Sequence, residues 1–160
     1  MEIAIKNNQR LIKANRQATE RVLAKALTHL AYKGNDTLIS GKQVLEHLEV
    51  SVLFVNDAGM RRLNHLHRGI DRTTDVLSFP LISEKPPLYH ARHLLLGDIV
   101  ISLPQAKRQA EEYGTNLNQE LARLLVHGLL HLLGYDHEKS SYKAAKMRRL
   151  EAELAEVVCL

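Results

Sequence analysis

The sequence has little cysteine and no long apolar run, and each shortage excludes a class of protein. Its single cysteine, Cys159, cannot form an internal disulfide, which is typical of proteins in a reducing cytoplasm. Apolar runs such as Leu94–Leu96 and Ile99–Ile101 are far shorter than the roughly 18 residues that a membrane span requires. Met1–Lys6 also lacks the apolar stretch of a signal peptide. We therefore expect a cytoplasmic protein that does not enter a membrane.

The chain has the composition of one globular domain. Of its 160 residues, 45% are apolar and 25% charged, a balance that suffices for a sizeable core. This length fits a single fold, without internal repeats or low-complexity segments, so we predict one domain over residues 1–160. The net charge of +4 permits a polyanionic partner but does not require one.

Hydrophobic periodicity predicts strands early in the chain and helices late. Strands are predicted at Ile3–Ile5, Leu48–Val55, Thr74–Phe79 and Leu95–Ser102, and helices at Ala18–Leu30, Ala58–Leu66, Leu103–Tyr113, Asn118–Leu133 and Ser140–Val158. The stretch Asn35–His47 stays open, although Ser40 could cap one or two helical turns there. The pattern indicates an α+β fold, in which a small mixed four-stranded sheet packs with five to six helices. The most apolar helix, Asn118–Leu133, should be central and buried.

Two histidines interrupt this apolar helix and need an explanation. His127 and His131 are four residues apart, so they project side by side from one helical face. Gly134 ends the helix and allows the chain to turn, so that His137 can return to the same point. Three imidazoles leave a fourth tetrahedral position open, as in catalytic zinc sites. We therefore predict a metal site formed by His127, His131 and His137, holding one zinc ion, with nickel as the alternative because imidazole suits both.

The spacing from His127 to His137 also reproduces that of the metzincin peptidases, H-x-x-x-H-x-x-G-x-x-H. The departure is at residue 128, where glycine replaces the glutamate that activates water in those enzymes. A glycine inside a helix costs about 1 kcal/mol relative to alanine, so another requirement must favour it. Gly128 could leave space for a bulky substrate, or it could allow a neighbouring element to pack closely.

Three segments of the chain form a recognisable combination. The longest is HGLLHLLGYDH, from His127 to His137, and the others are TDVLSFP, from Thr74 to Pro80, and GDIVIS, from Gly97 to Ser102. Together they resemble the YbeY family of rRNA-maturation endoribonucleases. With Asn64 and Arg68, the resemblance extends with gaps from about Val50 to Glu138. It covers the N-terminal third only in general layout.

The resemblance implies a zincin-like fold, zinc held by the three histidines, and metal-dependent cleavage of single-stranded RNA. It further implies a role in 16S rRNA 3′-end processing and ribosome quality control, with the small ribosomal subunit and assembly factors as partners. An arginine at the position of Arg68 is implied to be essential in that family. Catalytic roles are therefore predicted for Arg68 and His127.

The residues themselves leave the role of Arg68 open. It follows a predicted helix and precedes Gly69, where a guanidinium could bind phosphate in a bidentate manner or could be ordinary solvated surface. Asp75 and Ser78 would lie on opposite faces of the predicted strand, so at most one should face the metal. Basic residues could follow an RNA backbone if they cluster in space: Arg61, Arg62, Arg72, Lys107, Arg108, Lys143, Lys146 and Arg148.

The function predicted from the sequence is therefore a zinc-dependent endoribonuclease that hydrolyses phosphodiester bonds. Two alternatives remain at this point. One is a metallopeptidase related to the metzincins, which the histidine spacing favours and Gly128 opposes. The other is a non-catalytic ribosome assembly factor with a structural zinc, which would need a fourth protein ligand.

Overall fold

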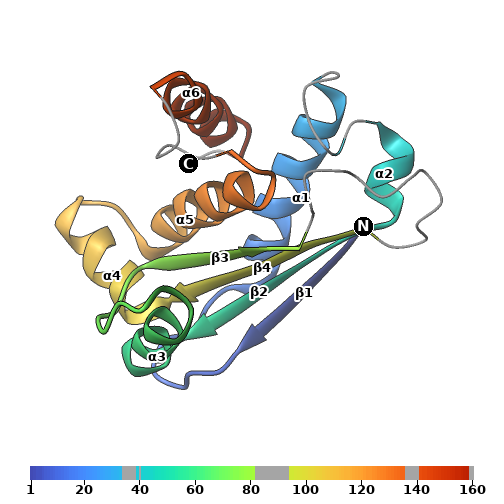
Figure 1. Cartoon of the computed structure of the whole chain (residues 1–160). Helices are drawn as coiled ribbons and strands as arrows, with labels where there is room; N and C mark the ends of the chain where they lie inside the picture. Colours follow the sequence, from blue (N-terminus) through green and yellow to red (C-terminus); the bar gives the residue numbers. More distant parts are fainter. Residues whose placement is uncertain (34–38, 40, 82–93, 136–140, 159–160) are drawn as a thin grey trace.

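The computed structural model describes residues 1–33, 39, 41–81, 94–135 and 141–158 (Figure 1). Over these residues the chain forms four strands and six helices, and the predicted α+β class is confirmed. The strands are β1 (Glu2–Asn7), β2 (Leu48–Val55), β3 (Val76–Pro80) and β4 (Leu94–Ser102). The helices are α1 (Arg16–Tyr32), α2 (Lys42–Glu46), α3 (Asp57–Arg68), α4 (Leu103–Glu112), α5 (Leu117–Leu132) and α6 (Ser141–Val158). No helix in the described part of the chain is long and apolar enough to cross a membrane.

The sheet is mixed, as the sequence predicts, with strand order β1-β2-β4-β3. Strands β1, β2 and β4 are parallel, while β3 pairs antiparallel with β4 at one edge. Gly97 of β4 makes that pairing possible, because a Cβ atom at this residue would lie 2.1 Å from the carbonyl oxygen of Phe79. Its φ of +134° is also a backbone conformation that residues with a side chain rarely adopt.

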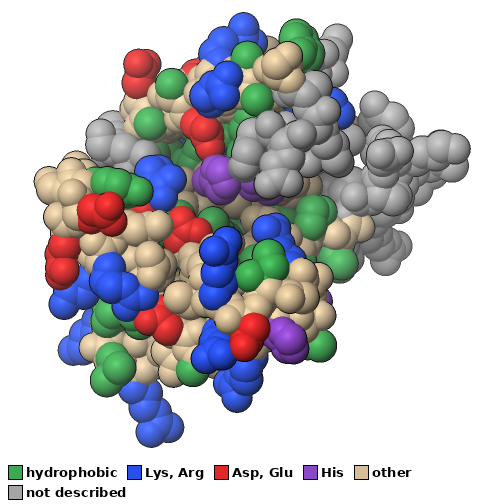
Figure 2. All heavy atoms as spheres, turned by 60° about the vertical axis from the view of Figure 1, so that its left-hand side comes forward, with side chains coloured by type: hydrophobic (Ala, Val, Ile, Leu, Met, Phe, Trp, Pro, Cys, Tyr) green, Lys and Arg blue, Asp and Glu red, His purple; other side chains and the backbone are tan. Residues whose placement is uncertain are grey.

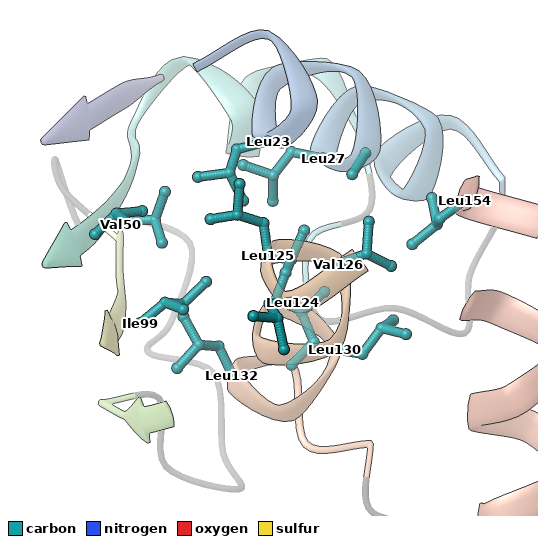
Figure 3. Close-up of a cluster of buried hydrophobic side chains, with 14 of the residues drawn as sticks. Leu23, Leu27, Val50, Ile99, Leu124, Leu125, Val126, Leu130, Leu132 and Leu154 are labelled. Carbon is teal, nitrogen blue, oxygen red and sulfur yellow. The ribbon is translucent and has the colours of Figure 1, made fainter. Parts of the chain in front are cut away.

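Helix α5 is the centre of the molecule. It packs against α1, α4 and α6 and against strands β3 and β4. Figure 3 shows leucine and valine side chains of α5 directed toward Leu23 and Leu27 of α1, toward Ile99 of β4, and toward Leu154 of α6. The buried apolar side chains on three sides of α5 are what hold it there, so the predicted central helix is confirmed.

Helix α3 lies on the opposite face of the sheet from α5 (Figure 1). Met60 packs there with Val55, Leu77 and Val100 in a smaller core cluster. The side chain of Asn56 caps the helix by accepting from the backbone amide of Gly59.

Most element boundaries differ from the predicted ones by one or two residues, among them those of α3, β3 and α2. Helix α3 continues to Arg68 and ends at Gly69 in the left-handed conformation, so the predicted end at Leu66 is two residues short. Strand β3 begins at Val76 rather than Thr74. The short helix that the sequence left open near Ser40 is α2, and its N-cap is Gly41. Ser40 itself lies outside the described residues.

Candidate metal centre

One row of side chains on α5 reaches solvent. From Leu121 to Leu133 every residue is buried except Arg123, His127 and His131, which follow one another at four-residue intervals. Four residues bring a helix back to nearly the same face, about 6 Å further along. The apolar remainder of the helix therefore fixes the direction in which these three side chains point.

The two histidines converge at their ring nitrogens. His127 Nε2 and His131 Nε2 are 3.2 Å apart, and the ring planes are inclined at 73°. Two nitrogens bound to one tetrahedral zinc ion at about 2.0–2.1 Å would lie roughly 3.3–3.4 Å from each other. The spacing of this pair therefore fits two ligands of a single ion.

Glu151 of α6 fixes the orientation of the His127 ring. Its Oε1 atom lies 2.7 Å from His127 Nδ1, the nitrogen that points away from His131. A carboxylate at Nδ1 favours the tautomer that is protonated there, which leaves the Nε2 lone pair for a metal. Sequence reasoning missed Glu151, because 24 residues and a turn separate it from His127.

The third predicted ligand, His137, lies outside the described residues, so its convergence with the pair stays a prediction. Within the described part of the chain, no group of three or more His, Cys, Asp or Glu side chains is arranged to hold a metal. His127 and His131 thus form the described portion of the candidate centre.

Gly128 packs directly against the sheet. A Cβ atom there would lie 2.9 Å from Ile99 Cγ2 and 3.1 Å from Ser78 Oγ. The Ser78 hydroxyl also donates to the carbonyl oxygen of Gly128 at 3.2 Å. Of the two interpretations of Gly128, close packing of a neighbouring element is therefore the one confirmed.

A second polar contact joins α5 to the start of β3. Arg123 forms a fork with the buried carboxylate of Glu120, and its Nη2 atom lies 3.8 Å from Asp75 Oδ2. The hydrogen bond with Glu120 raises the pKa of Arg123, so this guanidinium stays charged. Asp75 also accepts from the Gln109 side chain.

The expectation that Asp75 and Ser78 face opposite ways is wrong, since both contact α5. That expectation assumed that the alternation of side chains along the strand includes Asp75, but Asp75 precedes the strand. Sequence reasoning also missed Arg123, although its four-residue spacing from His127 was available as a signal.

Arg68 is exposed in the last turn of α3. Within the described residues it forms no ion pair or hydrogen bond with the histidine pair, so its catalytic role stays a prediction. The predicted basic set comes from three parts of the chain: α3 and the segment after it (Arg61, Arg62, Arg72), α4 (Lys107, Arg108) and α6 (Lys143, Lys146, Arg148). The first two parts adjoin each other, because Arg108 lies 2.9 Å from Asp57 at the start of α3.

These features indicate a class. Paired histidines four residues apart on one helix, one of them in contact with a carboxylate through its other ring nitrogen, are a ligand pattern that catalytic metal sites use. Comparison with known proteins specifies the family: the sequence model described as "Endoribonuclease YbeY" matches residues 4–158, and the chain belongs to that family.

Curated relatives carry the same name over most of their length. The chain is 51% identical over 120 residues to Endoribonuclease YbeY of Persephonella marina, covering 72% of this chain and 76% of the relative. It is 38% identical over 157 residues to Endoribonuclease YbeY of Thermodesulfovibrio yellowstonii, covering 96% and 95%.

A solved structure shares the fold. The solution structure of TM1509 from Thermotoga maritima superimposes with a TM-score of 0.61 at 26% identity, covering 98% of this chain and 88% of that one.

Proposed function

We propose that this protein is a metal-dependent endoribonuclease that cuts single-stranded RNA. The observation that carries the proposal is the pair of Nε2 atoms, 3.2 Å apart on the central helix, in a chain of the YbeY family. Relatives named as endoribonucleases, up to 52% identical among those compared, support the reaction class.

The ligands we propose are His127 and His131, joined by His137, for one zinc ion. When bound, zinc polarises the scissile phosphodiester and lowers the pKa of a water molecule. The protein's own contribution begins with Glu151, which keeps the proton of His127 on Nδ1 and so directs Nε2 to the shared point. Nickel is the alternative ion, since imidazole suits both metals.

Arg68 is proposed to bind the substrate phosphate. Its guanidinium offers two parallel N–H donors that match two phosphate oxygens. As a donor to the negative charge that develops on phosphorus, it would stabilise the transition state more than the bound substrate.

The peptidase alternative loses support at Gly128. In that alternative a side chain at residue 128 activates water, but here this position faces Ile99 and Ser78 of the sheet with no room for a Cβ atom. The same packing aligns α5 with β3, so the glycine serves the fold rather than the reaction.

The cellular role follows from the family. We propose that the RNA is rRNA, that the cut belongs to maturation of the 16S rRNA 3′ end, and that the small ribosomal subunit and assembly factors are the partners. A cytoplasmic site of action fits the single cysteine.

Three substrates of matched concentration test this function: a single-stranded RNA, its duplex with a complementary strand, and casein. We expect cleavage inside the single strand, little cleavage of the duplex, and no hydrolysis of casein. Equal cleavage of both RNAs would remove the strand preference, and chelator-sensitive casein hydrolysis would restore the peptidase alternative.

A further inference from the structure

A basic hollow lies on the outer side of α3. It has a volume of about 930 Å³, and its walls are the exposed row of the helix together with residues 71–73 that follow it. The charged side chains in its wall are Asp57, Arg61, Arg62, His65, Asp71 and Arg72. Neither wall includes the two histidines of α5.

The carboxylates of the hollow are already paired. Arg61 Nε and Nη2 donate to the two oxygens of Asp71, both at 2.7 Å, and Arg108 of α4 lies 2.9 Å from Asp57. The Arg61 hydrogen bond lowers the pKa of the Asp71 carboxyl, which keeps that pair ionised.

Two cations remain available in the same hollow. Within the described residues Arg62 and Arg72 form no ion pair, and both are exposed. The hollow therefore has a positive surplus that comes from two separate elements, a helix and the segment after it.

The segment that carries Arg72 is fixed in place. The side-chain amide of Asn64, a residue only 4% exposed, donates to the carbonyl oxygen of Arg72 at 2.8 Å. The Arg61–Asp71 fork holds the same segment from the helix side. Because this backbone segment is already ordered in the free protein, binding a ligand there costs less conformational entropy.

The segment also connects the hollow to the candidate metal centre. Thr73 lines the hollow, and two residues later Asp75 contacts Arg123, which precedes His127 by one helical turn. By chain and helix geometry the hollow lies on the order of 20 Å from the histidine pair. On this side of the molecule, Figure 2 shows histidine side chains near the centre and several Lys and Arg side chains below them.

We propose that this hollow, which we call the α3 hollow, binds backbone phosphates of single-stranded RNA several nucleotides away from the cut. This rests on the proposed function. An open surface with two separated arginines suits a chain of repeating phosphates better than a single small anion. The exposed imidazole of His65 offers a ring on which a base can stack.

The test compares two double variants that change the net charge equally. Arg62→Ala with Arg72→Ala removes the free cations of the α3 hollow. Arg21→Ala with Lys25→Ala removes two exposed cations of α1, which lies across the sheet. Both pairs are introduced into His131→Ala protein, so that a labelled 20-nucleotide single-stranded RNA is bound without being cut.

The α3 hollow variant should bind the RNA roughly 10- to 100-fold more weakly than its parent at physiological salt. The slope of log affinity against log salt should fall by about 1.4, which is two phosphate contacts on a single strand. The α1 variant should change both quantities little. Equal losses in the two variants would overturn the proposal.

Two further outcomes are informative. If polyglutamate of matched length binds as tightly as RNA and loses the same factor, the α3 hollow is a site for an acidic protein and the RNA assignment is overturned. Binding also separates this proposal from the reaction itself: if the unmodified protein cuts no RNA, the proposed function fails, while the affinity difference still decides the α3 hollow.

Discussion

At the scale of single residues, the candidate centre depends on a contact that comes from another helix. His127 and His131 would share a helical face in any α-helix, but rotation about their side-chain bonds leaves the nitrogens free to diverge. The 2.7 Å contact of Glu151 with His127 Nδ1 removes that freedom on one ring. Glu151, which is not part of the histidine motif, therefore orients that motif for metal binding.

Replacing Glu151 with glutamine should weaken zinc binding about 10- to 100-fold, because the carboxylate that orients the His127 imidazole is lost. The protein should stay folded, since the Glu151 side chain is one third exposed. Competition with a chelator of known affinity measures the change. Glu156→Gln, an exposed change on the same helix, is the control, and equal affinities in the two variants would refute the role of Glu151.

Replacing Arg68 with alanine should leave zinc content unchanged and reduce RNA cleavage by roughly two to three orders of magnitude. The reason is that loss of a donor to the transition state costs about 2.7–4 kcal/mol. Arg68→Lys should recover only part of the rate, because an ammonium lacks the planar fork. Arg21→Ala is the control. Cleavage by Arg68→Ala at the unmodified rate would remove the residue from the site.

At this scale the sequence predicted the residues whose role follows from local spacing. The His127 and His131 pair is one case, since four residues on a helix fix a shared face. Glu151 and Asp75 could not be predicted, because their contacts with α5 depend on how distant segments pack. His137 stays a prediction of the motif.

At the scale of elements, the separation of α5 from the edge strand is set by close contact at Gly128. Ile99 is β-branched and fully buried in β4, so it cannot turn away from an added Cβ atom. The hydroxyl of Ser78 donates to the Gly128 carbonyl across the same contact. The distance between α5 and the edge strand is therefore fixed at this contact.

Gly128→Ala should destabilise the protein by about 1 kcal/mol. A gain of about 1 kcal/mol in helix propensity is outweighed by overpacking that typically costs 1–3 kcal/mol. Urea denaturation measures the free energy of unfolding. The double variant with Ile99→Ala should be more stable than the sum of the single changes predicts, since the added methyl group fills the space that Ile99 leaves. Simple additivity would contradict the clash.

Helices α1 and α6 are joined by an ion-pair cluster that depends on pH. Glu153 contacts Lys33 and lies 2.6 Å from His29 Nε2. These hydrogen bonds lower the pKa of the Glu153 carboxyl from its usual 4.5. The stabilisation is therefore fully present above pH 4.5 and is lost as the pH falls through the lowered pKa.

Glu153→Gln should accordingly lower the free energy of unfolding at pH 7 by about 0.5–1 kcal/mol, an amount reduced by solvent screening. The difference from the unmodified protein should shrink as the pH falls below 4.5 and vanish once the Glu153 carboxyl is protonated in the folded state as well. Thermal unfolding over a series of pH values from 7 downward measures it, with Glu156→Gln as the control. A difference that persists at low pH would show that Glu153 acts by packing rather than by charge.

Most elements could be predicted because each has a strong local pattern. The apolar alternation of β2 gave its bounds without error, and the near-continuous apolar sequence of α5 predicted its central place. The end of α3 was placed at Leu66 because the last turn is polar, and polar residues on an exposed turn do not reveal whether the helix continues.

At the scale of the whole molecule, the strand order depends on contacts that no local pattern contains. Strand β4 lies between β2 and β3, and Gly97 allows the edge strand to approach it. Periodicity predicted four strands in a mixed sheet, while their order follows from how the helices cover the two faces. The net charge of +4 likewise does not say where on the surface a polyanion would bind. In the structure, the ion pairs that the carboxylates form with arginines show which positive charges are left over.

The central claim is that a metal ion held by the histidines of α5 is required to cut single-stranded RNA. Cleavage of a labelled single strand is followed for the purified protein as isolated, after exhaustive chelation, and after stoichiometric zinc is returned, beside His131→Ala under the same conditions. We expect loss of cleavage on chelation, recovery with about one equivalent of zinc, and neither zinc binding nor recovery in the variant. Undiminished cleavage by the metal-free protein, or full activity of His131→Ala, would contradict it.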